Sequence, residues 1–305
     1  TCALPISLDQ EKYLNQIAKD FEYQSNLIKI YASSNNFPKC LLDTAALISL
    51  LKIGYLTPSN YYLLYKDISN FLEETIEYYI RDKVTKGIKI KYIYESIQQC
   101  QYVIPRIYLM IICGSIYLEF YPIKFREIIY DLLNAAKCVQ NPLRAFWLRY
   151  FLFKKIKNYL PINIGAYLNN GEYFYEYRKI SLLFFLENLE EMIYFAIRIR
   201  KEIFIDDKKL NEKQRTEICS SIEEIIQDIS SFKGLDKNIF VNKVLPKFYD
   251  IISNVDDTKD FYLEHIVIAG IIKNFNIELY FDSQGISIIF LTFRKVIYNK
   301  DFDII

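Results

Sequence analysis

The sequence is short of glycine and proline. Its 305 residues contain eight of each, which is about half of their average usage in globular proteins. All-β proteins and repeated βαβ units need these residues for their many tight turns, so the composition favours a mostly helical chain. An excess of charge of one sign is missing as well. The formal net charge of +1 argues against a basic nucleic-acid-binding arm and against an acidic tail.

Residue types that carry chemistry are also scarce. The one histidine, His265, lies in an apolar, helix-like stretch, and we interpret it as a packed core residue. The six cysteines are at least 13 positions apart, which excludes zinc-type spacing and a dense disulfide framework. Free thiols of this kind are typical of a reducing, cytoplasmic compartment.

Sequence motifs of the common enzyme classes are absent. The chain contains no phosphate-binding loop, no glycine-rich dinucleotide turn and no nucleophile elbow. We therefore predict no enzyme activity, no cofactor and no metal. A hydrolase that uses a cysteine or His265 is the less favoured alternative, because its residues would have to come together in a cleft from distant positions.

Long hydrophobic runs are missing too. One uncharged apolar stretch covers residues 107–118. It is shorter than the roughly 20 residues needed to cross a bilayer. A short helix that is apolar on nearly all sides is typically buried between other helices. The sequence thus predicts a core helix here and no transmembrane segment.

Helical periodicity is the dominant pattern. Apolar residues recur every three or four positions, and Thr57–Pro58 and Asn141–Pro142 each provide an N-cap followed by a proline in the first helical turn. The predicted helices span residues 9–32, 37–53, 58–86, 89–102, 105–120, 122–138, 142–159, 172–202, 211–231, 236–252, 257–274 and 283–298. Short connections make consecutive helices antiparallel neighbours. We therefore expect an all-α fold, an α-solenoid of stacked helix hairpins similar to HEAT repeats, rather than one globular bundle.

Two longer, polar connections, near residues 161–171 and 205–214, are expected to be surface loops of a single solenoid that spans residues 1–305. The chain begins with threonine instead of methionine, so we expect a trimmed fragment of a longer protein. The lysines near residues 154–157, which lie among aromatic residues, are interpreted as an ordinary helix surface and not as a nucleic-acid patch.

Arg106 is an unusual residue for its position. It follows Pro105, a typical helix start, so its positive charge lies in the first turn, near the positive end of the helix dipole. One interpretation is that Arg106 reaches solvent or an acid on the adjacent helix, such as Glu95. The other is that it orients a helix end that docks a partner.

The segment that contains this arginine, Pro105-Arg106-Ile107-Tyr108-Leu109-Met110, resembles the Pro-Arg-Leu-Tyr-Leu-Met motif of the large scaffold subunit of retromer, the vacuolar protein sorting-associated protein 35 family. Isoleucine replaces the first leucine. Residues 56–65, Gly87 and residues 139–152 are similar to the same family in the same order, so the resemblance is strongest over residues 55–161. The loop at 161–171 lacks the acidic run of many relatives, and the connection at 203–215 is less charged.

The resemblance implies a non-enzymatic coat scaffold, of which this chain is the N-terminal portion. It implies that Pro105, Arg106, Ile107, Tyr108, Leu109 and Met110 dock the arrestin-like retromer subunit, for endosome-to-Golgi and recycling transport of membrane cargo. The expected location is cytoplasmic and peripheral on endosomal membranes, with sorting nexins, cargo tails and a Rab-family GTPase as further partners. The metallophosphoesterase-like subunit is expected to bind the C-terminal half, which is absent here. The alternative is a helical-repeat adaptor in another pathway, such as nuclear transport or nucleic-acid binding.

Overall fold

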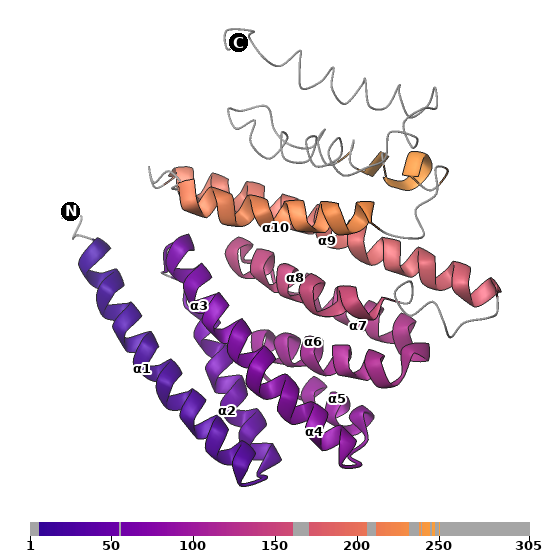
Figure 1. Cartoon of the computed structure of the whole chain (residues 1–305). Helices are drawn as coiled ribbons and strands as arrows, with labels where there is room; N and C mark the ends of the chain where they lie inside the picture. Colours follow the sequence, from indigo (N-terminus) through magenta and orange to yellow (C-terminus); the bar gives the residue numbers. More distant parts are fainter. Residues whose placement is uncertain are drawn as a thin grey trace, which may run out of the picture. The chain divides into compact units, whose positions relative to one another are not determined.

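A computed structural model of the chain describes residues 6–54, 56–160, 171–205 and 212–231, together with residues 238, 240–244, 246, 247 and 250. The chain divides into two compact units, Thr1–Leu160 and Pro161–Ile305, and each is described by itself. Throughout the described ranges, every regular element is a helix (Figure 1). The predicted all-α fold is therefore confirmed.

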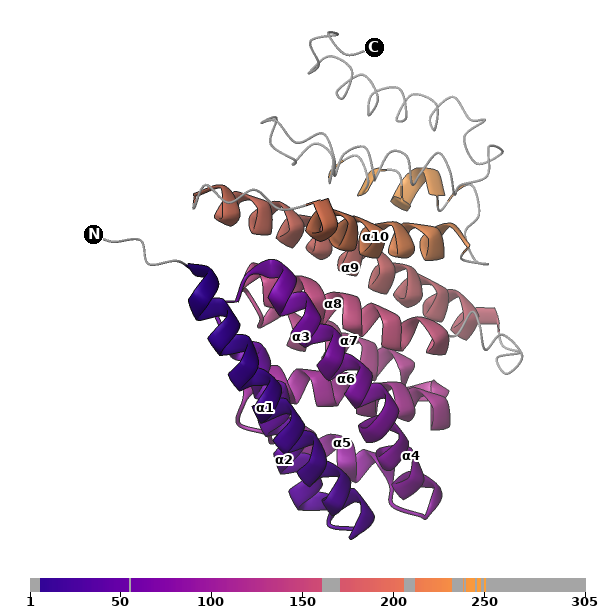
Figure 2. The same ribbon diagram turned by 60° about the vertical axis from the view of Figure 1, so that its left-hand side comes forward.

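The first unit is a stack of helix hairpins (Figures 1 and 2). Its helices are α1 (Ile6–Ser33), α2 (Phe37–Ser49), α3 (Pro58–Phe71), α4 (Tyr78–Thr85), α5 (Ile90–Gln98), α6 (Val103–Phe120), α7 (Phe125–Lys137) and α8 (Pro142–Ile156). Single helical turns named η1 (Leu50–Lys52), η2 (Leu72–Glu77), η3 (Pro122–Lys124) and η4 (Lys157–Tyr159) adjoin them. Helix α6 packs against α2, α5, α7 and α8, so it is the central helix of this unit. This is the hairpin packing that the sequence predicts for an α-solenoid.

Local signals in the sequence place several helix ends. The Thr57 side chain accepts a hydrogen bond from the Asn60 N–H at 3.4 Å, directly before α3. The Asn141 side chain accepts one from the Arg144 N–H at 3.2 Å, before α8. Each cap satisfies an N–H that has no partner inside its helix. Gly87, with φ of +100°, follows α4, where a left-handed conformation favours glycine.

Three predicted boundaries are wrong in detail. The helix predicted over 58–86 divides into α3, the π-helical turn η2 and α4. The helix predicted over 89–102 ends at Gln98, and the next one begins at Val103 instead of Pro105. Proline is tolerated at the third position of α6 because the first four N–H groups of a helix have no intrahelical acceptor. A proline therefore marks the first turn of a helix but not its first residue.

Aromatic side chains fill the core between α3, α6 and α8. The Trp147 ring lies 5.1 Å from that of Tyr65, and the Tyr108 ring lies 5.0 Å from that of Phe151, measured between ring centroids. At Gly114 of α6, a Cβ atom would lie only 3.1 Å from Leu132 Cδ1 of α7, so the glycine permits a close approach of the two helices. Among the described helices, α6 alone is long and apolar enough to cross a membrane, and 72% of it is buried. The prediction of a core helix at this position is confirmed.

The second unit contains α9 (Gly171–Ile205), α10 (Glu212–Ser230) and the π-helical turn η5 (Phe240–Val244). Helices α9 and α10 pack together, and the isoleucine stripe predicted for α10 is buried, with Ile222, Ile225, Ile226 and Ile229 each 0% exposed. The helix predicted over 236–252 is described only at residues 238, 240–244, 246, 247 and 250, which are helical. Other predictions lie wholly or mostly outside the described residues: the helices at 257–274 and 283–298, His265, and the loops near 161–171 and 205–214.

Candidate functional site at the start of helix α6

Helix α6 buries five of the six residues of the predicted docking segment. Pro105, Ile107, Tyr108, Leu109 and Met110 all lie in the core of the first unit. Arg106 is half-buried and reaches the surface. Any direct contact of this segment with a partner therefore falls to Arg106, while its neighbours fix the helix that carries it.

Tyr108 connects α6 to α8. Its side chain is 1% exposed, and its hydroxyl has no hydrogen-bond partner within the described part of the chain. Burial raises the pKa of this phenol well above its ordinary value. The residue is thus a core aromatic, which stabilises α6 through its ring rather than through its hydroxyl group.

The guanidinium of Arg106 has no acidic partner among the described residues, and its backbone N–H donates to the Tyr102 carbonyl at 3.0 Å. Glu95, the acid that the sequence suggested, instead lies 3.7 Å from Lys91 Nζ. The positive charge in the first turn of α6 is therefore not compensated by a carboxylate of the described chain.

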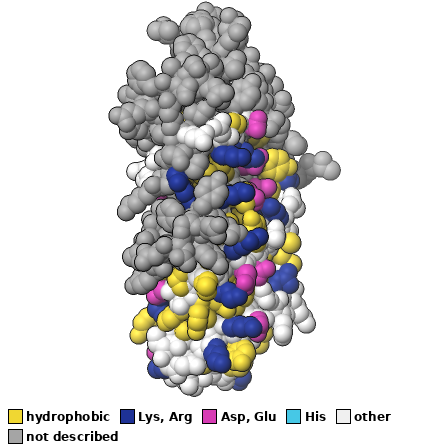
Figure 3. Space-filling model, turned by 90° about the vertical axis from the view of Figure 1, so that its right-hand side faces the viewer, with side chains coloured by type: hydrophobic (Ala, Val, Ile, Leu, Met, Phe, Trp, Pro, Cys, Tyr) yellow, Lys and Arg dark blue, Asp and Glu magenta, His cyan; other side chains and the backbone are white. Residues whose placement is uncertain are grey.

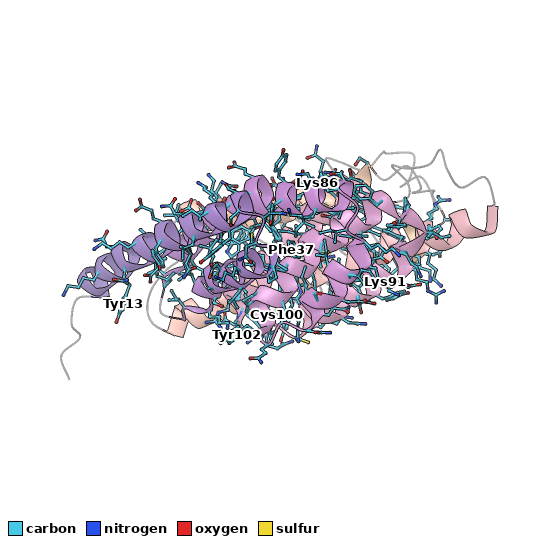
Figure 4. The ribbon with its side chains drawn as sticks, turned by 90° about the horizontal axis from the view of Figure 1, so that it is seen from below. Tyr13, Phe37, Lys86, Lys91, Cys100 and Tyr102 are labelled. Atoms are coloured by element: carbon cyan, nitrogen blue, oxygen red, sulfur yellow. The ribbon has the colours of Figure 1, made fainter. Side chains whose placement is uncertain are left out.

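Two further cations lie close to the start of α6. Lys52 Nζ, from the end of η1, lies 3.9 Å from the centroid of the Tyr102 ring, a cation–π contact. The Arg144 guanidinium, from the first turn of α8, donates a hydrogen bond to the carbonyl of Lys52. Tyr102 and Val103 are 56% and 39% exposed, and Figure 4 shows Tyr102 at the margin of the molecule. We call Lys52, Tyr102, Val103, Arg106 and Arg144 the basic edge.

Sequence reasoning found Arg106 but missed Lys52, Tyr102 and Arg144. The contact between Arg144 and Lys52 joins residues 92 positions apart, and no local pattern reveals it. One signal was available: Lys52 and Tyr102 lie in the connections before α3 and α6, and Arg144 lies in the first turn of α8.

The opposite end of α6 is held by ion pairs. Arg81 contacts Glu119 of α6 and lies 3.0 Å from Glu77, and Lys155 Nζ lies 2.7 Å from Glu77. The Tyr159 hydroxyl donates to Glu119 at 3.3 Å. Burial acts to lower the pKa of Arg81, but hydrogen bonds with Tyr159 and Glu119 outweigh it, so this pKa is raised. This network joins α4, α6 and α8 at one end of the unit.

The described residues contain no set of histidine, cysteine, aspartate or glutamate side chains that could hold a metal ion. Burial raises the pKa of the Cys40 thiol to about 11 and raises that of Cys113 further. Both thiols remain protonated at neutral pH, and a protonated thiol is a poor nucleophile. Lys155 of the lysine-rich end of α8 is largely buried and is paired with Glu73 and Glu77.

Comparison with known proteins identifies the family of the chain. The family model described as vacuolar protein sorting-associated protein 35 matches residues 13–280. Vacuolar protein sorting-associated protein 35C of Arabidopsis thaliana is 27% identical to this chain over 274 residues, which are 90% of this chain and 34% of the relative. Vacuolar protein sorting-associated protein 35 of Dictyostelium discoideum is 25% identical over 249 residues, 82% of this chain and 31% of the relative. The protein of the same name from Schizosaccharomyces pombe is 28% identical over 238 residues, 76% of this chain and 28% of the relative.

The chain spans about a third of the length of the curated relatives that it matches. The family match covers the whole first unit from residue 13 onward and most of the second. On this evidence, the chain belongs to the vacuolar protein sorting-associated protein 35 family.

Proposed function

We propose that this chain is the N-terminal part of a retromer scaffold subunit and that it docks the arrestin-like retromer subunit at the basic edge. One observation carries the proposal: Arg106 is the residue of the predicted docking segment that reaches the surface, and no carboxylate of the described chain pairs with it. An arginine of this kind suits a carboxylate that another protein supplies, because its planar guanidinium can bind both oxygens.

The residues around Arg106 support a protein partner. Tyr102 and Val103 expose apolar surface next to the cations. Exposed aromatic residues and arginines are enriched in the centres of protein interfaces. The buried members of the segment, such as Tyr108 and Leu109, contribute by holding α6 rigid, so that the edge is formed before the partner binds.

Membership of the family supports a wider proposed role. As a scaffold, the chain provides binding surface and no catalytic centre, and it acts in endosome-to-Golgi and recycling transport at the cytoplasmic side of endosomal membranes. Sorting nexins, cargo tails and a Rab-family GTPase are further proposed partners. We propose that the metallophosphoesterase-like subunit binds the part of the relatives that lies beyond the aligned third.

Binding of this chain to the arrestin-like subunit from the same source, measured by isothermal titration calorimetry, tests the proposal. Arg106→Glu should weaken the complex strongly. Lys89→Glu is the control, because Lys89 lies at the start of α5, away from Tyr102, and also contacts an exposed tyrosine ring. Absence of binding by the unmodified chain would refute docking. Tight binding to nucleic acid in its place would favour the helical-repeat adaptor.

A further inference from the structure

Acidic residues are absent from the three connections that form the basic edge. Residues 50–57, 99–106 and 137–144 contain Lys52, Arg106, Lys137 and Arg144 but no aspartate or glutamate. Helices α3, α6 and α8 begin at these connections, so their N-termini add partial positive charge at the same edge. The gathering of positive charge is not visible in the sequence, because the three segments lie about 40 to 50 positions apart along the chain.

Two lysines elsewhere in the first unit, Lys86 after α4 and Lys124 between α6 and α7, are paired with carboxylates. Lys86 Nζ lies 2.7 Å from Asp82, and Lys124 Nζ lies 2.8 Å from Glu127. On the face drawn in Figure 3, basic and acidic side chains accordingly lie next to one another. The cations of the basic edge instead contact neutral groups: Lys52 contacts an aromatic ring, and Arg144 contacts a backbone carbonyl.

We propose that the basic edge binds a carboxylate-rich segment of the arrestin-like subunit and that Lys52 and Arg144 contact it together with Arg106. This inference rests on the proposed docking function and adds the chemistry of the partner surface. A patch of cations without acids attracts a carboxylate-bearing surface and repels a basic one, which gives specificity as well as faster association.

A protein segment fits this edge better than a phosphate-rich surface does. Binding to nucleic acid or to an anionic membrane draws on clusters of several cations. Here, the exposed ring of Tyr102 and the side chain of Val103 lie among only a few cations. A partner must therefore cover apolar surface and supply carboxylates at the same time, as a folded protein does.

The two added residues are held in place before binding. The Lys52 ammonium rests on the Tyr102 ring at 3.9 Å, and the Arg144 guanidinium is fixed by the Lys52 carbonyl. Side chains that are already ordered lose less conformational entropy when a partner binds. Lys52 is the better residue to change, because substituting Arg144 also removes a hydrogen bond that connects α8 to η1.

The test compares Lys52→Glu, Lys52→Gln and the control Lys89→Glu in calorimetric titrations with the arrestin-like subunit. We expect Lys52→Glu to weaken binding by roughly 10- to 100-fold and Lys52→Gln to weaken it less, while Lys89→Glu changes it less than about twofold. Raising the salt concentration from about 0.1 M to 0.5 M should weaken the unmodified chain more than Lys52→Glu, because salt screens the charge that this variant lacks.

The outcomes separate the two proposals. If the unmodified chain does not bind the subunit, both fail. If Arg106→Glu abolishes binding and neither Lys52 variant alters it, docking stands and the extended carboxylate-binding edge is wrong. Flotation with phosphatidylserine vesicles is measured in parallel, and membrane binding that Lys52→Glu abolishes would assign the edge to lipid and overturn the inference. If Lys52→Glu lowers the melting temperature, the titration of Lys52→Gln tests the inference instead: weaker binding supports a contact of Lys52 with the partner, and unchanged binding contradicts it.

Discussion

Reversing the charge of Arg106 should separate docking from folding. Arg106 is half-buried, has no acidic partner in the described chain and occupies the fourth position of α6. A glutamate in the first turn of a helix interacts favourably with the dipole by about 0.3 to 1 kcal/mol. Arg106→Glu should thus change the free energy of unfolding by no more than about 1 kcal/mol, and the isolated chain should keep its melting temperature within a few degrees.

Leu109→Ala provides the contrasting perturbation on the same helix. The Leu109 side chain is 2% exposed, and removing a buried leucine side chain costs about 2 to 5 kcal/mol. For a unit of this size, 1 kcal/mol corresponds to about 2 to 4 °C, so the melting temperature should fall by roughly 4 to 20 °C. The folded fraction of this variant should still bind the partner.

For affinity we expect the opposite ranking: Arg106→Glu should weaken binding more than Leu109→Ala does. Truncating or reversing one member of an interfacial charge pair costs about 2 to 5 kcal/mol, which corresponds to roughly 30- to 5,000-fold in affinity. Circular dichroism melts and calorimetric titrations on Arg106→Glu, Leu109→Ala and the control Lys89→Glu measure both properties. If Arg106→Glu melts as early as Leu109→Ala, the arginine stabilises the fold internally. If it alters neither property, the docking role of the start of α6 is wrong.

Three further predictions test the packing. Iodoacetamide at pH 8 should alkylate the exposed Cys138 but not the buried Cys40, whose pKa of about 11 leaves about 0.1% as thiolate; rapid native labelling of Cys40 would contradict its burial. Burial raises the phenol pKa of Tyr61 and Tyr108, so their contribution to stability is present below the unfolded pKa of about 10 and is lost at higher pH; phenolate absorbance of the buried tyrosines should rise together with the loss of helical circular dichroism, and not before it. Because Glu119 is partly exposed in its ion pair with Arg81, Glu119→Gln should cost less than about 1 kcal/mol in urea melts, and less at high salt.

The sequence predicted those parts of the fold that local chemistry determines. Thr57 and Asn141 cap their helices as expected, because each capping oxygen and the N–H that donates to it lie three residues apart. The start of α6 was placed too late because Pro105 is tolerated inside the first turn. Burial within the docking segment was not predictable in detail: α6 is apolar on nearly all sides, so its periodicity does not show which residues face outward.

Contacts between distant positions had no counterpart in the sequence patterns. Arg81 and Glu119 are 38 positions apart, and Arg144 and Lys52 are 92 apart. Such pairs depend on how hairpins stack, which side-chain spacing within one helix does not encode. For this reason Arg106 was recognised from its own helix, whereas the edge around it emerged only from the structure.

Each end of α6 carries a charge of the sign that the helix dipole disfavours: Arg106 lies in its first turn and Glu119 in its last. The first unit compensates Glu119 itself, through Arg81 and Tyr159. It supplies no carboxylate from its described residues for Arg106. A partner carboxylate would offset both the missing ion pair and the unfavourable dipole. We therefore expect Arg106 to lower the stability of the free chain slightly and to strengthen the proposed complex, so Arg106→Glu should leave the free chain as stable as before or slightly more stable while it weakens the complex. A purely structural arginine would not give effects of opposite sign.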